Sequence, residues 1–432
     1  MERILSAPAF ATLVRDFGRE RVKDAVAEHL TTLRATRGEY DEAEAATAVG
    51  EAIVTATRST LRRVINGTGV IIHTNLGRSP LHPSLWAEAA EIVTGYSNLE
   101  FDLDEGDRGA RDEHLTRICR TLFACESAVL TNNNAAATLL AMAALAAGKE
   151  VIVSRGELVE IGGAFRVPDV IQQGGAKLRE VGTTNRTRAR DYADAVTRRT
   201  AAILRVHRSN FDIVGFTEMP TVPELVDVAR QKKIPLLYDE GSGRVVELHP
   251  YGFSPGSTLS ELVGQGVDVL TCSTDKLIGA TQGGLLLGRE DLIAKCRRHP
   301  LMRALRVGKE TYAIVGATLR AFATKKYEES VPIYRMLATP LDVLRTRAEL
   351  LIRDTKCRIA GSRCALGGGT TPTETIASVS VAVPGHAHEL HARFLRNDPP
   401  IAGRIQNDDF LIDVRTLLES DLTPVRQMLA PP

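Results

Sequence analysis

Residues 269–284, VLTCSTDKLIGATQGG, combine the end of an apolar run with a single lysine and a glycine-rich turn. The run from Val267 to Thr271 predicts a buried strand, and Lys276 follows it on the turn. Partial burial lowers the pKa of a lysine and makes its amine a nucleophile that can react with an aldehyde. A lone lysine at a strand end is more often solvated. Whether Lys276 is a buried nucleophile or a solvated side chain depends on which other residues the chain places beside it.

Six further apolar runs alternate with helical patterns along the chain. The predicted strands are residues 127–130, 150–153, 177–181, 201–206, 234–238, 267–271 and 284–287. Runs this apolar, separated by helices, predict an α/β fold with a mostly parallel sheet covered on both faces. Ligands of such sheets bind at the carboxyl ends of the strands. That edge is predicted to hold Asn133, Ser154, Asn210, Asp239 and Lys276.

Asp239 follows the predicted strand at 234–238. A carboxylate there can keep a heteroaromatic nitrogen protonated, although it could also bind a metal or cap a helix. The polar turn at 132–134 precedes a helix at 135–147, whose amino end suits a phosphate or is an ordinary asparagine cap. The phosphate turn, Asp239 and Lys276 occur in this order along the chain. Together they predict a pyridoxal 5′-phosphate site of the aspartate aminotransferase type.

The composition is that of an ordinary globular protein. The chain has 432 residues, 44% of them hydrophobic, and a net charge of +1, which gives no global argument for nucleic-acid binding. Its six cysteines form no CxxC pair, which is typical of reduced thiols in a cytoplasmic protein. No signal-peptide pattern and no long uncharged apolar run are found, so we expect no membrane span.

The chain divides into three predicted domains. Residues 1–63 show helical periodicity, with a last helix from Glu42 to about Arg63 that ends in Arg58 and Arg62. Residues 64–324 contain the predicted sheet. Residues 325–432 predict an α+β domain, with a helix at 340–354, a strand at 375–383, a helix at 386–395 and a strand pair at 401–405 and 410–414. His386 and His388 have no partner at metal-ligand spacing, so we expect no metal site.

Several segments also resemble one enzyme family, bacterial selenocysteine synthase, and the similarity extends over nearly the whole chain. The segments are NGTGVIIHTNLGR at 66–78, NNNAA at 132–136, VSRGELVEIGGAFRVP at 153–168, VGTTNRT at 181–187, SNFDIVGFT at 209–217, DEGSG at 239–243 and DKLIG at 275–279. The resemblance implies a fold-type I pyridoxal-phosphate enzyme. It also implies a homo-oligomer, built from dimers into a decamer, that uses serine-charged tRNA(Sec) and selenophosphate.

The resemblance also implies roles for particular residues. Lys276 would hold the cofactor and act as the base for the seryl α-proton, and Asp239 would pair with the ring nitrogen. The helix start, Ser273 and Asn210 would complete cofactor binding. The residues implied at the helix start are Asn133, Asn134 and Ala135. The residues implied for the selenium donor are Arg78, Arg303 and Arg306.

The implied reaction is β-elimination from seryl-tRNA(Sec) to an aminoacrylyl-tRNA, followed by addition of selenium. Hydroxide leaves poorly without an acid, and His73 is one candidate, although a structural role for it is at least as plausible. Residues 1–63 would bind tRNA. One alternative is a related lyase or desulfurase acting on a small amino acid or amino sugar, which would not need these helices. A second is a tRNA-binding protein without the cofactor, against which the presence of Lys276 and Asp239 argues.

Overall fold

The computed structural model describes residues 1–161 and 165–430. The chain forms two compact units, Met1–Arg63 and Val64–Pro432. Residues 162–164 fall inside the segment at 153–168 that resembles the family, so that part of the segment lies outside the described residues.

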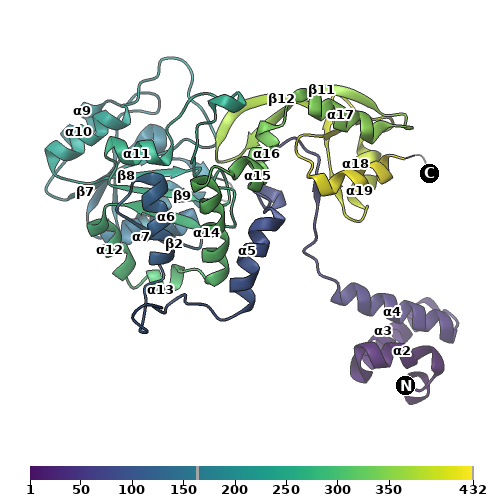
Figure 1. Ribbon diagram of the computed structural model, residues 1–432. Coiled ribbons are helices and arrows are strands. Elements are labelled where there is room, and N and C mark those ends of the chain that lie inside the picture. Colours follow the sequence, from purple (N-terminus) through teal and green to yellow (C-terminus); the bar gives the residue numbers. More distant parts are fainter. Residues whose placement is uncertain (162–164, 431–432) are drawn as a thin grey trace. The chain divides into compact units, whose positions relative to one another are not determined.

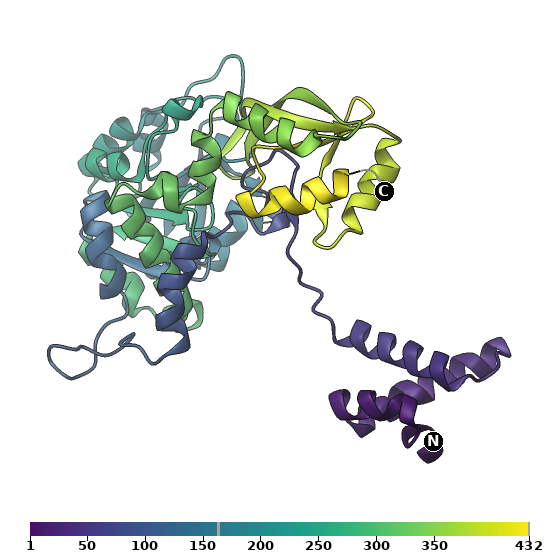
Figure 2. The same cartoon turned by 45° about the vertical axis from the view of Figure 1, so that its right-hand side comes forward.

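The first unit is a small helical bundle with its own core. Its helices are α1 (Glu2–Leu5), α2 (Pro8–Phe17), α3 (Arg19–Thr36) and α4 (Glu42–Thr57). Phe10, Val22, Val26, Val49 and Ile53 are buried together, so the helical spacing of the apolar residues does produce one shared interior. Figure 2 shows α4 packed along α2 and α3. The bundle therefore has a core of its own.

The helix predicted to run to about Arg63 ends earlier. α4 is capped at its start by Asp41, whose carboxylate accepts hydrogen bonds from the amides of Ala43 and Glu44 at 2.9 Å. It ends at Thr57, because Arg58 adopts an extended conformation (φ −64°, ψ 134°). Arg58, Arg62 and Arg63 therefore lie on the segment after the helix.

The second unit is built on a seven-stranded sheet with the strand order β2-β10-β9-β8-β7-β3-β6. These strands are β2 (Ser127–Thr131), β3 (Glu150–Ser154), β6 (Lys177–Val181), β7 (Thr200–Val206), β8 (Leu236–Gly241), β9 (Val269–Ser273) and β10 (Gly284–Gly288). Neighbouring strands are parallel except at β10, which is antiparallel to both β2 and β9. The predicted mostly parallel sheet is confirmed.

Helices cover both faces of this sheet, as Figure 1 shows. One face is covered by α6 (Glu113–Phe123), α9 (Ala189–Ala195), α10 (Val222–Lys232), α11 (Leu259–Gln265) and α14 (Lys309–Ala323). The other is covered by α7 (Asn134–Ala146), α8 (Val167–Gln173), α12 (Glu290–Arg298) and α13 (Met302–Leu305). Side chains alternate along each strand, so that in β9 Leu270 faces the first layer and Val269 the second. Outside the first layer, α5 (Pro83–Thr94) packs along α14.

A second sheet, β11-β12-β15-β14, lies in the last part of the chain. Its strands are β11 (Arg358–Gly367), β12 (Thr371–Val383), β14 (Arg404–Gln406) and β15 (Asp409–Asp413). The helices of this part are α15 (Tyr327–Ser330), α16 (Pro332–Ala338), α17 (Leu341–Ile352), α18 (Ala387–Leu395) and α19 (Leu422–Leu429). β11 was not among the predicted strands.

The predicted strand at 401–405 is divided in two. β13 (Ile401–Ala402) pairs in parallel with β1 (Ile65–Asn66), whereas β14 pairs with β15. The division follows from Gly403, whose close packing against Phe410 leaves no room for a side chain. Two further short strands, β4 (Glu160–Ile161) and β5 (Phe165–Arg166), pair with each other. No helix in the described part of the chain is long and apolar enough to cross a membrane.

Candidate active site

The turn that carries Lys276 is held closed by hydrogen bonds at both ends. The Thr274 amide donates to the Gly283 carbonyl at 3.0 Å, and the Thr274 hydroxyl donates to the Thr281 carbonyl at 2.6 Å. Within the turn, Gly279 has a positive φ of 76°, and a Cβ there would collide with Val331, so only glycine fits. The turn therefore fixes where the lysine backbone lies.

The Lys276 side chain is buried, with 7% of its surface exposed. Its Nζ donates to the Gly369 carbonyl at 3.2 Å. Burial lowers the pKa of Lys276, and the charge of Arg78 lowers this pKa further. Because the neutral amine is the nucleophilic form, a lower pKa increases the reactive fraction near neutral pH. The commoner alternative, a solvated lysine, is wrong here.

Asp239 lies in β8 and is also buried, and three side chains from other elements donate hydrogen bonds to its carboxylate. The donors are Asn134 Nδ2 at 2.7 Å to Oδ1, Thr138 Oγ1 at 3.3 Å to Oδ2 and Thr271 Oγ1 at 3.3 Å to Oδ1. Burial raises the pKa of Asp239, while the Asn134 hydrogen bond and the charge of Lys276 oppose this shift. The donors both stabilise the ionised form and fix the direction of the carboxylate.

Helix α7 begins at the same edge of the sheet. Asn133 caps it, its Oδ1 accepting from the Ala136 amide at 2.8 Å. The first-turn amides of Asn134 and Ala135 have no carbonyl within the helix to bond with, so they can bind an anion. The Asn134 side chain instead turns to Asp239. Ser273 is buried at the end of β9, the strand that leads into the lysine turn.

Arg78 lies beside the lysine turn. Its Nη1 is 2.5 Å from Asp275 Oδ2, and the Ser79 hydroxyl donates to the Lys276 carbonyl at 2.8 Å. Arg78 has a positive φ of 64°, an uncommon conformation for a residue with a side chain. A cavity of about 550 Å³ opens here, lined by Arg78, Asp275, Trp86 and Gln282 among others. Arg78 can therefore offer its guanidinium to an anion in this cavity.

The other two predicted donor-site arginines lie on α13 and the residue that follows it. Arg306 Nη1 is 3.3 Å from Glu100 Oε1, and the Arg306 backbone bridges to Thr131 at the end of β2. Arg303 is exposed on α13. The contacts of Arg78 and Arg306 run to different carboxylates, so the grouping of the three arginines stays a prediction.

Two further predicted residues have contacts of their own. The Asn210 side chain is exposed and donates to the Glu160 carbonyl at 2.7 Å, so its role towards the cofactor stays a prediction. His73 is half-buried, and burial lowers its pKa. Its backbone pairs with that of Arg78 in an isolated bridge.

Thr138, Thr271, Asp275 and Gly369 were not predicted. Thr138 and Thr271 bond Asp239, Asp275 bonds Arg78, and Gly369 bonds Lys276. The only sequence signal was local: Thr138 lies one helical turn after Asn134, and Asp275 adjoins Lys276.

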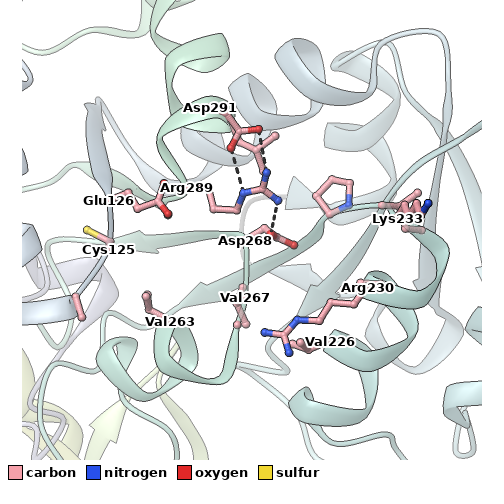
Figure 3. A pocket seen from close by; sticks show the side chains of 17 residues that line it. Cys125, Glu126, Val226, Arg230, Lys233, Val263, Val267, Asp268, Arg289 and Asp291 are labelled. Atoms are coloured by element: carbon pink, nitrogen blue, oxygen red, sulfur yellow. Dashed lines mark hydrogen bonds and ion pairs between the residues drawn. The ribbon is translucent and has the colours of Figure 1, made fainter.

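Another cavity lies at the opposite ends of the strands, where β8 and β9 begin, and has a volume of about 640 Å³. Figure 3 shows Arg289 there, bound to Asp268 and Asp291 at 2.9 and 3.0 Å. Arg289 is therefore paired with two carboxylates. Within the described residues, no group of three or more His, Cys, Asp or Glu side chains could hold a metal ion.

Comparison with known proteins gives a consistent result. A model of the L-seryl-tRNA selenium transferase family matches residues 64–418, and one described as selenocysteine synthase N terminal matches residues 1–34. The chain is 45% identical to L-seryl-tRNA(Sec) selenium transferase of Geobacter sulfurreducens, covering 98% of this chain and 96% of that protein. The Carboxydothermus hydrogenoformans protein of the same name is 41% identical, covering 85% and 81%.

Among solved structures, D-glucosaminate-6-phosphate ammonia-lyase is similar in fold. It superimposes with a TM-score of 0.63 at 22% identity, covering 87% of this chain and 96% of that chain. At this identity the likeness shows the fold alone, and it confirms the predicted fold class.

Proposed function

The chain belongs to the L-seryl-tRNA selenium transferase family, and we propose how its own residues perform that reaction. It converts L-seryl-tRNA(Sec) into L-selenocysteinyl-tRNA(Sec), and its substrates are the charged tRNA and selenophosphate. The observation that carries the residue assignment is the buried Lys276 amine at the sheet edge that also holds Asp239 and the start of α7. The direct test is formation of selenocysteinyl-tRNA(Sec) by the purified protein.

The cofactor of this enzyme is pyridoxal 5′-phosphate, and the residues at the site fit it. Lys276 supplies a buried amine with a lowered pKa, and Asp239 supplies a carboxylate fixed by three donors. The amides of Asn134 and Ala135 and the Ser273 hydroxyl would bind the phosphate, with Asn133 holding the helix start in place. Asn210 is the proposed partner of the ring oxygen. Gly369 leaves space at Lys276, since a Cβ there would lie 2.5 Å from Nζ.

The bound cofactor withdraws electrons from the α-carbon of the seryl group, so that its proton can leave. Asp239 maintains this effect by holding a proton on the ring nitrogen. Lys276, once its amine is free, accepts the α-proton, because its buried position favours the neutral form. The β-hydroxyl would be protonated and lost as water. The selenium of selenophosphate would then add to the β-carbon, with its bond to phosphorus cleaved by water and phosphate released.

We assign the selenium donor to Arg78, Arg303 and Arg306. Supporting this, Arg78 lines the cavity beside the lysine turn, and Asp275 holds its guanidinium through one nitrogen. A guanidinium has five N–H donors, so the remaining ones can bind a compact oxyanion.

Replacing Arg78 with glutamine is therefore expected to raise the KM for selenophosphate by about tenfold to a hundredfold, the cost of one charge-assisted contact. The KM for seryl-tRNA(Sec) should change little. Steady-state kinetics with each substrate varied in turn measures both. An unchanged selenophosphate KM would remove Arg78 from the donor site. Replacement of the exposed Arg363 by glutamine is the matched control.

We propose that residues 1–63 recognise tRNA. The unit has its own core, its last segment, after α4, contains Arg58, Arg62 and Arg63, and its first 34 residues match the selenocysteine synthase N-terminal model. Binding through phosphates should weaken steeply as salt rises. This unit also disfavours the alternative of a small-molecule lyase or desulfurase, which would have no use for it.

Deletion of residues 1–63 is expected to leave the cofactor absorbance intact and to abolish turnover of seryl-tRNA(Sec), because the two units have separate cores. A tRNA titration and a mass measurement on the same truncated sample check this. Lost assembly with retained affinity per subunit would instead mean that the helices only support an oligomer.

We further propose a homo-oligomer built from dimers, with a decamer as the expected assembly, working in the cytoplasm. Support for association comes from large apolar side chains that are strongly exposed, among them Tyr96, Leu103, Val214 and Phe216. Support for a reducing compartment is that all six cysteines are free.

A further inference from the structure

A third cavity lies at the carboxyl ends of β7 and β8. Its volume is about 380 Å³, and Arg208, Arg244, Thr370 and Thr371 are among the residues that line it. Tyr238 also lines it, which places the cavity towards the face covered by α10 and α11, since Tyr238 packs against that core. Asp239, the next residue, turns to α7 on the other face. Val206 and Phe211, which pack towards α7, line the cavity as well, and neither Asp239 nor Lys276 is among its lining residues.

Two polar side chains lining this cavity are buried without a partner. Arg244 is 9% exposed and Thr371 is 7% exposed. Within residues 1–161 and 165–430, neither Arg244 Nη1 nor Thr371 Oγ1 has a hydrogen-bond partner. Burying a guanidinium nitrogen and a hydroxyl unpaired is unfavourable, so both are expected to bind a ligand atom.

Two arginines at the cavity, Arg208 and Arg244, can receive an anion. Arg208 is half-buried and lies over the Phe211 ring, 6.0 Å from its centroid. Arg205 is already neutralised by Glu157 at 3.0 Å. Of the two carboxylates that line the cavity, Glu374 accepts from the Ser254 amide at 3.0 Å and Asp212 is exposed. Arg208 and Arg244 are thus the cations left to receive an anion.

One short loop separates this cavity from the lysine. The Gly369 carbonyl accepts from Lys276 Nζ, and the Gly369 amide donates to the Ser209 carbonyl at 3.2 Å. The next residue, Thr370, lines the cavity and accepts from His207 Nε2 through its carbonyl at 3.1 Å. A substrate group attached to the serine at Lys276 can therefore reach the cavity across this loop.

We propose that this cavity binds the last phosphodiester of the tRNA, with Arg244 and Arg208 as cationic donors and Thr371 as a neutral one. This assignment rests on the proposed function, in which the serine bound at Lys276 is esterified to the terminal ribose. That ribose carries the phosphodiester on its other side, so an anion must lie one sugar away from the ester. The reaction's other oxyanion is selenophosphate, and the experiment below separates the two sources.

Gly256 provides a variant that moves Arg244 without removing its charge. A Cβ at Gly256 would lie 2.8 Å from Arg244 Cζ, so the guanidinium rests against the glycine. The Gly256→Ala substitution therefore displaces the end of a flexible side chain, at little cost to the fold. Arg230→Gln is the control, because Arg230 is an exposed arginine beside the cavity at the opposite strand ends (Figure 3).

The test compares full-length tRNA(Sec) with the same tRNA carrying a neutral methylphosphonate at its last linkage. For the unaltered enzyme, the neutral linkage should weaken binding by about tenfold to a hundredfold. Arg244→Gln should weaken binding of natural tRNA and should distinguish the two RNAs several-fold less than the unaltered enzyme does, with the remaining difference due to Arg208. The Gly256→Ala enzyme should distinguish the two RNAs less than the unaltered enzyme does. The Arg230→Gln enzyme should bind both RNAs with the affinities of the unaltered enzyme.

Three results would overturn the assignment. One is an Arg244→Gln enzyme whose tRNA affinity still falls as far as that of the unaltered enzyme when the last linkage is neutral. Another is an Arg244→Gln enzyme with unchanged tRNA affinity and a raised KM for selenophosphate, which would assign the cavity to the selenium donor. The third is a Gly256→Ala enzyme with normal cofactor absorbance and unaltered discrimination. The proposed function fails separately, if the unaltered enzyme makes no selenocysteinyl-tRNA(Sec).

Discussion

Replacement of Lys276 by alanine is expected to abolish selenocysteinyl-tRNA(Sec) formation, with a loss of at least about a thousandfold, because one side chain both binds the cofactor and moves the α-proton. The buried position of Lys276 means that no solvent amine can take its place. Single-turnover assays with seryl-tRNA(Sec) measure the loss.

Labelling provides the control for this prediction. Borohydride reduction of the unaltered enzyme should fix a pyridoxyl group on the peptide that contains Lys276. Lys149→Ala, at an exposed lysine between α7 and β3, should retain both label and activity. A label recovered on a different lysine, or turnover retained by Lys276→Ala, would contradict the assignment.

Replacement of Asp239 by asparagine is expected to keep the cofactor bound but to lower turnover by about a hundredfold to ten-thousandfold, the range typical of losing a group that controls a proton. Asparagine preserves the size of the side chain but cannot stabilise a positive ring nitrogen. Absorbance of the bound cofactor and exchange of the seryl α-proton are the two measurements. Near-normal α-proton exchange would mean that another carboxylate lies beneath the ring.

Variants that remove single hydrogen bonds to Asp239 provide controls for this prediction, with smaller expected effects on turnover. Asn134→Ala removes the donor that opposes the effect of burial, so the pKa of Asp239 should rise. Because the ionised carboxylate is the active form, the acid limb of the pH–rate profile should move to higher pH. Thr271→Val removes a longer hydrogen bond to the same carboxylate, so turnover should fall by no more than about tenfold. An acid limb that stays in place in Asn134→Ala would show that Asp239 does not set it.

The main elements of the large fold were predictable because local sequence and long-range packing agree there. An apolar run such as 267–271 can be buried on both faces only in a covered sheet, and the structure places β9 inside that sheet, between β10 and β8. The placement of Asp239 and Lys276 at one edge of the sheet could be predicted from the direction of the strands alone.

Errors arose where a distant contact decided the local structure. β11 is paired along its length with β12, and this pairing gives a strand to a segment for which no strand had been predicted. β13 leaves the second sheet to pair with β1, more than 300 residues earlier in the chain. Propensity within a short window cannot report either pairing.

The sequence by itself therefore determined the order of strands and helices, the lysine turn, the carboxylate that precedes it and the family resemblance. Only the tertiary structure decided which polar groups meet: Asn134 with Asp239, Gly369 with Lys276, and Arg244 with Thr371 in one cavity. The physical reason is that a buried hydrogen bond depends on distance and direction to within a fraction of an ångström. Those distances and directions are set by how helices and strands pack against one another. The residue types of the sequence therefore do not determine them individually.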